Sequence, residues 1–324
     1  MSRELIIVIG LALLFDFLNG VHDSSNIVAT MISSRALRPY AALILAAAAE
    51  FLGPFLFGVA VARTIGDEIA QTSVITLEVI TACLSAAILW NLITWLLGIP
   101  SSSSHALIGG ILGAVWVGVG LHAIKLGGLS KVLIALFASP VIGFACGFII
   151  MRLIYFLARR ASPGINELFK RGQLITALAM AFSHGTNDAQ KTMGIITLGL
   201  VVDGVLPRFL VPTWVVAMSA AMIALGTSLG GWRLIRTLGG KFYKIRPVHS
   251  FSAQISSAIV ILTASFFGGP VSTTQVVSSA IIGVGSSERF GKVRWSVAGD
   301  MLTAWLITIP ASALISAGVY WLLV

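Results

Sequence analysis

Two short polar segments within long apolar runs contain the residues best suited to chemistry. Residues 17–26 read FLNGVHDSSN and residues 182–191 read FSHGTNDAQK, so each segment places a glycine, an aspartate and amide groups among apolar residues. An isolated carboxylate in hydrocarbon costs several kcal/mol or takes up a proton. We therefore predict that Asp23 and Asp188 hold a bound ligand, and a structural helix cap is the alternative for both.

A second pair of polar segments combines proline with hydroxyl residues. Residues 98–105 read GIPSSSSH and residues 268–275 read GGPVSTTQ, and an apolar run precedes and follows each. This pattern predicts a helix, an unwound tip and a returning helix whose first turn exposes N–H groups and a positive dipole end, which bind anions. Each hydroxyl could instead bond to its own backbone or to a neighbouring helix. The predicted ligands of a tetrahedral oxyanion are Ser102, Ser103, Ser104, Ser272, Thr273, Thr274 and Gln190.

The aspartates and the nearby amide side chains predict a cation site. Carboxylate and amide oxygens, together with carbonyl groups of an unwound helix, are the hard ligands that small cations prefer. We expect sodium at Asp23, Asn26, Asn187 and Asp188, because a metal ion uses the extra oxygens and a protonated carboxyl group does not require them. The tips contain no lysine or arginine, so a co-bound cation must offset the charge of the anion. Adjacent anion and cation sites indicate symport.

Several other polar residues in these runs are open to more than one interpretation. His22 and His184 occupy non-equivalent positions, and we interpret them as packing or supporting residues rather than as metal ligands. Lys191 is either an anion contact or a counter-ion of the aspartate three residues before it. Asp16 and Asp300 have no counterpart elsewhere in the chain, so capping or interfacial exposure explains them at least as well as function.

Composition indicates a helical membrane protein with several spans. Hydrophobic residues make up 57% of the 324 residues and charged residues only 10%, and mean hydropathy is +0.98. No cleavage site follows the first apolar run, so we expect the N-terminus to belong to the fold. Cys83 and Cys146 lie in apolar runs and predict neither a disulfide nor a metal site. The net charge is +9, and the basic residues lie between the apolar runs. This placement is better explained by the orientation of a membrane protein than by nucleic-acid binding.

The chain contains an internal duplication. Asp23 aligns with Asp188, and Pro100 aligns with Pro270 at nearly the same offset along the chain. Two independent motifs that recur in the same order favour duplicated transporter halves over a short-period repeat array. The predicted organisation is a first repeat at 1–161, a cytoplasmic linker at 162–172 and a second repeat at 173–324.

Charge asymmetry predicts that the two repeats have inverted topology. If each half crosses the membrane three times, most basic residues fall on one face, which the positive-inside rule assigns to the cytoplasm. Both termini then lie outside. Residues 4–31 would form a helix about 42 Å long against a hydrocarbon core of ~30 Å, so we expect breaks at residues 19–25 and 185–190. The basic residues on the predicted cytoplasmic face are Arg35, Arg38, Arg159, Arg160, Lys170, Arg171, Arg233, Arg236, Lys241, Lys244, Arg246, Arg289, Lys292 and Arg294.

The predicted fold is therefore an all-α polytopic membrane protein with two inverted-topology repeats, broken helices and two re-entrant or hairpin elements tipped with serine and threonine. This pattern resembles the inorganic phosphate transporter (PiT) family of sodium- or proton-coupled phosphate permeases. The second copy, GTNDAQKT, is similar to the family signature GANDVANA, and the first copy has His22 where asparagine is usual. The resemblance implies a coupling or gating role for Glu50 and a homodimer in which a transport region moves against a scaffold.

The leading function is a symporter that moves inorganic phosphate with sodium across the plasma or inner membrane, without a cofactor. Alternatives within transport are a proton-coupled phosphate permease, a metal-phosphate carrier and a sulfate permease. They stay open because hydroxyl groups and helix dipoles do not distinguish oxyanions by the number of protons that these carry. An enzyme is not expected, since no catalytic triad order, HExxH pair or nucleotide loop accompanies the polar segments. A channel is disfavoured because the polar groups cluster instead of lining a continuous path.

Overall fold

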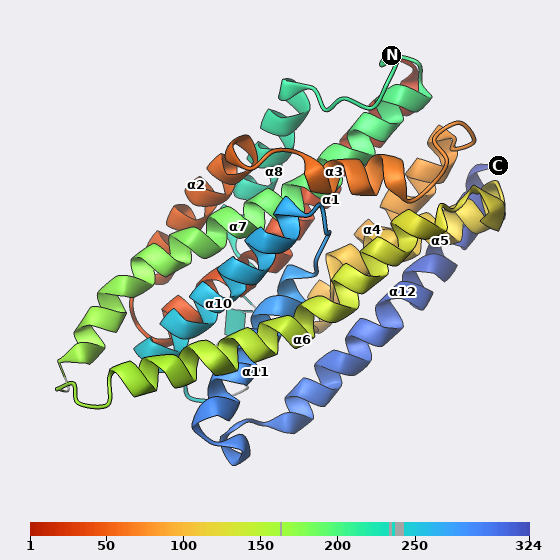
Figure 1. Cartoon of the computed structure of the whole chain (residues 1–324). Coiled ribbons are helices and arrows are strands. Elements are labelled where there is room, and N and C mark those ends of the chain that lie inside the picture. The colour runs from red at the N-terminus through yellow and green to blue at the C-terminus, as the bar shows by residue number, and fades with distance from the viewer. Residues whose placement is uncertain (163, 233–234, 237–242) are drawn as a thin grey trace.

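The computed structural model describes residues 1–162, 164–232, 235–236 and 243–324 and shows a bundle of helices (Figure 1). Within these ranges the only β pairing is an isolated bridge between Ala70 and Ile124. In chain order the helices are α1 (Arg3–Ser33), α2 (Pro39–Leu56), α3 (Ala60–Arg63), the π-helix η1 (Thr64–Glu68), α4 (Leu77–Leu97), α5 (Ser103–Gly118), the 3₁₀ turn η2 (Leu121–Ala123), α6 (Leu126–Leu157), α7 (Ile165–Val202), α8 (Thr213–Leu229), α10 (Pro247–Phe266), α11 (Thr273–Glu288), the 3₁₀ turn η3 (Phe290–Lys292) and α12 (Trp295–Leu323).

Six of the described helices, namely α1, α2, α4, α6, α10 and α12, are long and apolar enough to cross a membrane. Helices α6 and α12 turn large apolar side chains outward, including Ile134, Val141 and Leu314. Apolar surface of this kind is expected where a protein faces lipid. The prediction of an all-helical protein with several membrane spans is confirmed.

The two ends of the bundle differ in which connections they carry. Both chain termini lie at one end, and the α6–α7 and α11–α12 connections lie at the other (Figure 1). Helices α1 and α7 consequently run in opposite directions, as do α6 and α12. Which end faces the cytoplasm stays a prediction. Arg233 and Lys241 of the predicted cytoplasmic cluster lie outside the described residues.

The predicted tips are present. Helix α4 ends before Gly98 and α10 ends before the pair Phe267 and Gly268, and both glycines adopt a left-handed conformation with φ of 69°. A left-handed residue commonly terminates a helix, and glycine adopts it without a steric penalty. The chain then stays non-helical until α5 begins at Ser103 and α11 begins at Thr273.

The predicted breaks in the first segment of each half are wrong. Helix α1 is continuous for 31 residues and α7 for 38 residues, through both aspartate segments. The glycines instead allow the backbone of a neighbouring helix to approach closely. A Cβ atom on Gly20 would lie 2.2 Å from the carbonyl oxygen of Ile223, and one on Gly185 would lie 2.4 Å from that of Glu50. Asp23 and Asp188 accept hydrogen bonds from Thr274 and Thr273 at the start of another helix, so the backbone does not have to unwind to satisfy the two carboxylates.

Helix packing repeats between the two halves. Helix α1 packs on α8 as α7 packs on α2, and α5 packs on α12 as α11 packs on α6. The close approaches repeat as well: Gly113 faces the carbonyl oxygen of Ala313, and Gly283 faces that of Phe144, each 2.1 Å from where a Cβ atom would lie. These matching helix pairs and close approaches are what a duplicated chain would show, and the duplication itself stays a prediction.

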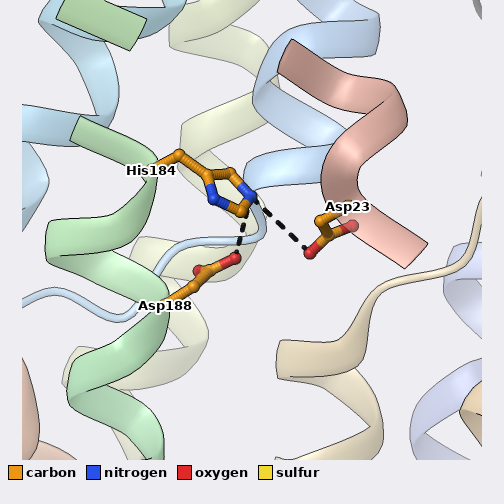
Figure 2. A group of neighbouring side chains, drawn as sticks. All are labelled: Asp23, His184 and Asp188. Atoms are coloured by element: carbon orange, nitrogen blue, oxygen red, sulfur yellow. Dashed lines mark ion pairs between the residues drawn. The ribbon is translucent and has the colours of Figure 1, made fainter. Parts of the chain in front are cut away.

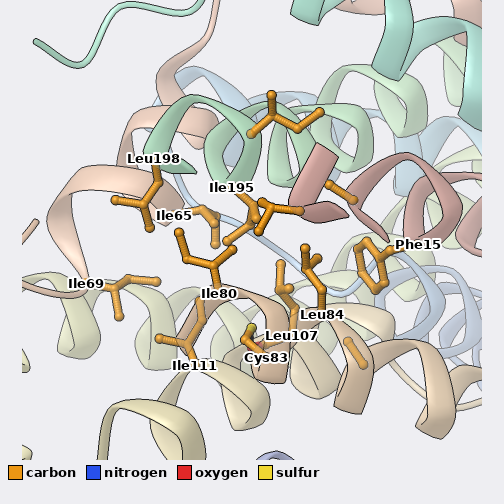
Figure 3. Close-up of a cluster of buried hydrophobic side chains, with 14 of the residues drawn as sticks. Phe15, Ile65, Ile69, Ile80, Cys83, Leu84, Leu107, Ile111, Ile195 and Leu198 are labelled. Atoms are coloured by element: carbon orange, nitrogen blue, oxygen red, sulfur yellow. Dashed lines mark hydrogen bonds between the residues drawn. The ribbon is translucent and has the colours of Figure 1, made fainter. Parts of the chain in front are cut away.

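A buried apolar cluster surrounds the middle of the bundle and fixes the helices that carry the aspartates. Figure 3 shows Ile80 and Cys83 of α4 meeting Ile111 of α5 and Ile195 of α7, beside Phe15 of α1. Both cysteines are free, and Cys83 is one of the apolar members of this cluster. Residues of α1 and α7 both belong to this cluster, so close packing of apolar side chains positions the two helices that carry the aspartates.

Candidate substrate and cation site

Two fully buried carboxylates, Asp23 of α1 and Asp188 of α7, meet in the interior of the bundle. His184, one helical turn before Asp188, points between them, as Figure 2 shows. Its Nε2 atom lies 3.1 Å from Oδ2 of Asp188 and 3.8 Å from Oδ2 of Asp23. The sequence predicts that the two aspartates converge, and the structure brings them together.

The hydroxyl tip of α11 bonds directly to these carboxylates. Thr273 donates through Oγ1 to Oδ2 of Asp188 at 3.0 Å and lies 3.5 Å from Oδ2 of Asp23. Thr274 donates through Oγ1 to Oδ1 of Asp23 at 2.8 Å. The tip of α5 reaches the same region, where Ser104 donates to the carbonyl oxygen of Val271 at 2.9 Å. The tip of α11 therefore lies at the aspartates, and the tip of α5 reaches the same region through Val271 and Lys191.

Ser102 and Ser272 cap the two helices that start at the tips. Oγ of Ser102 accepts the N–H of His105 at 3.1 Å, and Oγ of Ser272 accepts the N–H of Gln275 at 3.4 Å. A serine N-cap satisfies one of the unpaired N–H groups of the first turn. The remaining backbone donors belong to the four residues at the helix starts, Ser103, Ser104, Thr273 and Thr274, all buried to within 3% exposure.

The two predicted asparagine ligands have different surroundings. Asn26 donates through Nδ2 to Oδ1 of Asp23 at 2.8 Å and to Oγ1 of Thr274 at 3.1 Å, and its Oδ1 atom is buried without a hydrogen-bond partner. Asn187 instead holds the second tip, since Nδ2 donates to the carbonyl oxygen of Gly269 and Oδ1 accepts the N–H of Val271. Asn26 therefore offers a free oxygen beside an aspartate, and Asn187 does not.

The neighbouring residues Gln190 and Lys191 of α7 contact different parts of the structure. Gln190 turns toward α3, where Oε1 accepts the N–H groups of Val61 and Ala62 at 2.8 and 3.3 Å, so it is not gathered with the other predicted oxyanion ligands. Lys191 extends its ammonium group to Asp188 and forms an ion pair with it. Of the two interpretations of Lys191, the counter-ion is the one that this geometry matches.

Three further buried titratable residues lie on α1 and α2, and two of them contact the site. Glu50 of α2 places Oε1 2.6 Å from Nδ1 of His184, and His22 places Nδ1 3.2 Å from Oδ1 of Asp23. Asp16 is fully buried on α1, and neither of its carboxylate oxygens has a hydrogen-bond partner. Sequence reasoning missed the central place of His184 and the burial of Asp16. The signal for His184 is its spacing of four residues before Asp188, which puts both on one helix face.

The arrangement combines donors for an anion with ligands for a cation. Asp23, His184 and Asp188 each offer a ligand atom, and these atoms lie within 4.8 Å of one another. The N-terminal turns of α5 and α11 present N–H and hydroxyl donors to the same region, where the helix dipoles favour negative charge. All of these residues are buried, so the site is closed to solvent and a ligand enters only after the helices rearrange.

A family profile, bacterial proteins and a solved structure are similar to this chain over most of its length. A profile of the phosphate transporter family matches residues 19–316. A protein of Rhizobium meliloti named "Probable low-affinity inorganic phosphate transporter" is 46% identical over 97% of this chain and 95% of its own length, and a protein of Bacillus subtilis with the same name is 46% identical over 98% and 96%. A solved structure named "The sodium-dependent phosphate transporter" matches 99% of both chains with a TM-score of 0.89 and 25% identity.

These matches confirm the resemblance drawn from the repeated motifs. Their names describe transporters, which are not enzymes, so the expectation of a non-enzymatic function is confirmed as well. Apolar helices long enough to cross a membrane recur along the whole chain, as a multi-pass membrane protein requires. On the family match and the two bacterial relatives, the chain belongs to the phosphate transporter family.

Proposed function

We propose that the chain is a secondary transporter that carries inorganic phosphate together with sodium ions. The observation that carries this proposal is the meeting of two helix N-termini, those of α5 and α11, with the buried carboxylates of Asp23 and Asp188. The names of the bacterial relatives support phosphate as the substrate, and the name of the solved structure supports sodium as the coupling ion.

Phosphate is proposed to bind at the starts of α5 and α11. Ser103, Ser104, Thr273 and Thr274 each combine a backbone N–H without an intrahelical acceptor and a hydroxyl group that can rotate. Four such pairs of donors suit the oxygens of a tetrahedral anion. Ser102 and Ser272 are proposed to act through their helices, because their hydroxyl groups already accept backbone N–H groups.

Sodium is proposed to bind beside Asp23. The carboxylate of Asp23, the free Oδ1 of Asn26 and the hydroxyl of Thr274 form a group of oxygens whose only charge is the carboxylate. A carboxylate and a bound anion repel each other strongly in a low-dielectric interior, so a cation between them favours loading of both. This interdependence is the physical basis of coupled transport.

We further infer that residues 1–161 and 173–324 form an inverted repeat joined by the linker 162–172. The opposite directions of α1 and α7, and the repeated packing of α1 on α8 and α7 on α2, support this relation. An inverted pair has two equivalent arrangements, one open to each side, and this provides a route from the closed structure to alternating access.

Proton coupling is a second candidate, favoured by a chain of buried titratable groups. Glu50, His184 and Asp188 follow one another at 2.6 and 3.1 Å, and such chains carry protons in other membrane transporters. This candidate shares the phosphate site with the first one and differs only in the coupling ion.

Uptake of labelled phosphate into proteoliposomes tests both candidates. We expect an inward sodium gradient to drive accumulation, a choline gradient to fail, and excess sulfate to compete weakly. Asp23→Asn should abolish the stimulation by sodium, whereas the matched change Asp300→Asn, at an exposed position, should not. Accumulation driven by a pH gradient alone would assign the protein to the proton-coupled candidate, and uptake of sulfate in preference to phosphate would reject both.

A further inference from the structure

Lys191 is a fully buried lysine whose ammonium group is surrounded by oxygen atoms. It contacts Oδ1 of Asp188, lies 2.5 Å from Oγ of Ser104 and donates to the carbonyl oxygen of Val271 at 3.0 Å. An ammonium group has three N–H donors, and these three oxygens match them in number. A carboxylate, a hydroxyl and a carbonyl oxygen are also the groups that a small hard cation selects.

The same position in the other half of the molecule contains a neutral residue. Asn26 aligns with Lys191 at the offset that relates the two aspartates, and Thr274 aligns with Ser104 at the offset that relates the two prolines of the tips. The contacts correspond as well: Asn26 bonds to Asp23 and Thr274, as Lys191 bonds to its own aspartate and Ser104. Two equivalent carboxylates therefore receive an amide in one half and an ammonium group in the other.

We propose that the ammonium group of Lys191 is a tethered cation that occupies, at Asp188, the position which a co-transported cation takes at Asp23. This inference rests on the proposed function as a cation-coupled phosphate transporter. A carrier with an amide at both positions has two carboxylates to neutralise with ions from solution. This chain neutralises one of them permanently, so each transport cycle takes up one cation fewer.

The physical reason for a tethered cation is the charge of the transporter when no substrate or sodium is bound. An unpaired carboxylate in a low-dielectric interior is strongly destabilised, which opposes any return step made without a bound cation. Lys191 stays with Asp188 when substrate and sodium leave, so that half of the site remains neutral throughout the cycle. Asp23 contacts an amide, two threonine hydroxyls and the rings of His22 and His184, so its described partners include no permanently charged group such as a lysine.

Measuring the coupling ratio in proteoliposomes tests the proposal. Lys191→Asn copies the residue of the first half, Lys191→Gln is a longer neutral replacement, and Lys191→Arg keeps the positive charge. We expect both neutral variants to transport one additional cation and one additional charge per phosphate, seen as a steeper sodium dependence and a shifted reversal potential. Lys191→Arg should keep the wild-type ratio.

A double variant distinguishes the effect of losing the ammonium charge from a general loss of structure or activity. Asp188→Asn combined with Lys191→Gln removes the carboxylate and the ammonium group together, so no new cation site forms and the wild-type ratio should return. If a variant is too slow to transport, the melting temperature of the purified protein reports binding: sodium should raise it more for Lys191→Gln than for the wild type or the double variant. An unchanged ratio and an unchanged sodium response in Lys191→Gln would overturn the proposal.

The same measurements distinguish this inference from the proposed function. If a pH gradient alone drives the wild type, sodium coupling fails, and the inference then requires one additional proton per phosphate in Lys191→Gln. If the wild type shows no cation coupling of any kind, the proposed function and the inference both fail.

Discussion

Oε1 of Glu50 lies 2.6 Å from Nδ1 of His184, and both side chains are completely buried. The carbonyl oxygen of Glu50 also faces Gly185, just as the carbonyl oxygen of Ile223 faces Gly20 in the other half. Ile223 is therefore the structural counterpart of Glu50. One half of the molecule has a carboxylate that orients a histidine toward the two aspartates, and the other half has an apolar side chain at that position.

Replacing Glu50 with glutamine should slow transport more than it weakens binding. The amide keeps the size of the side chain but removes the charged acceptor that orients His184, an interaction worth about 1.5–3 kcal/mol. We expect turnover to fall about tenfold or more while the apparent sodium affinity changes less. Phosphate uptake at several sodium concentrations measures both quantities. Glu78→Gln, at an exposed position in the first turn of α4, is the control, and wild-type turnover in Glu50→Gln would contradict the role.

Replacing Thr274 with valine should weaken phosphate and sodium binding together. Valine keeps the shape of threonine but removes the hydroxyl that donates to Asp23 and accepts from Asn26. Loss of such a bond costs about 0.5–1.5 kcal/mol, or up to about tenfold in affinity. The control is Thr303→Val, an exposed threonine whose hydroxyl bonds only to the backbone of its own helix. Unchanged affinities in Thr274→Val would leave this hydroxyl with a packing role alone.

Alanine at Gly20 or Gly185 should destabilise the fold. The added Cβ atom would lie 2.2 or 2.4 Å from a backbone oxygen, which is far inside van der Waals contact and cannot be relieved by a side-chain rotation. Overpacking of this kind costs about 1–3 kcal/mol or more. Gly10→Ala and Gly318→Ala are matched controls, because nothing lies within 4 Å of a Cβ atom at either position. Melting temperatures in detergent compare them, and equal stability of all four variants would show that the helices do not depend on these close approaches.

The predicted topology can be checked with single cysteines. Cysteines at Arg38, Gly164 and Lys244 should react with membrane-impermeant reagents from the cytoplasmic side, and those at Asp67 and Asp203 from the external side. The expectation follows from the charge asymmetry between the two faces and from the inverted directions of the halves. Labelling of Asp67 and Gly164 from the same side would contradict it.

Local patterns were enough to predict the tips and the internal duplication. A glycine followed within two residues by a proline and a run of hydroxyl residues marks the ends of α4 and α10 at Gly98 and Gly268. Proline alone is a weaker signal, because Pro54, Pro140 and Pro310 lie inside helices. The convergence of Asp23 and Asp188 followed from the recurrence of the motif, which placed both aspartates in one predicted cation site.

The remaining features depend on contacts between distant segments. A glycine beside polar residues is compatible with a broken helix and with a helix that accepts a neighbouring backbone, and only the positions of Ile223 and Glu50 decide between them. In the same way the sequence shows that Lys191 is near Asp188 but not that Ser104 and Val271 complete its surroundings. Sodium coupling, the homodimer and the membrane orientation stay predictions.

Contacts cross between the halves at both aspartates: Asp23 accepts from Thr274, and Lys191 beside Asp188 bonds to Ser104, although Asp188 also accepts from Thr273 of its own half. A single half therefore contains only part of the site, and two identical halves would have to pair to complete it. Two identical subunits would carry the same residue at the positions of Asn26 and Lys191. The asymmetry between Asn26 and Lys191 therefore requires that both halves belong to one chain, in which each position has its own residue.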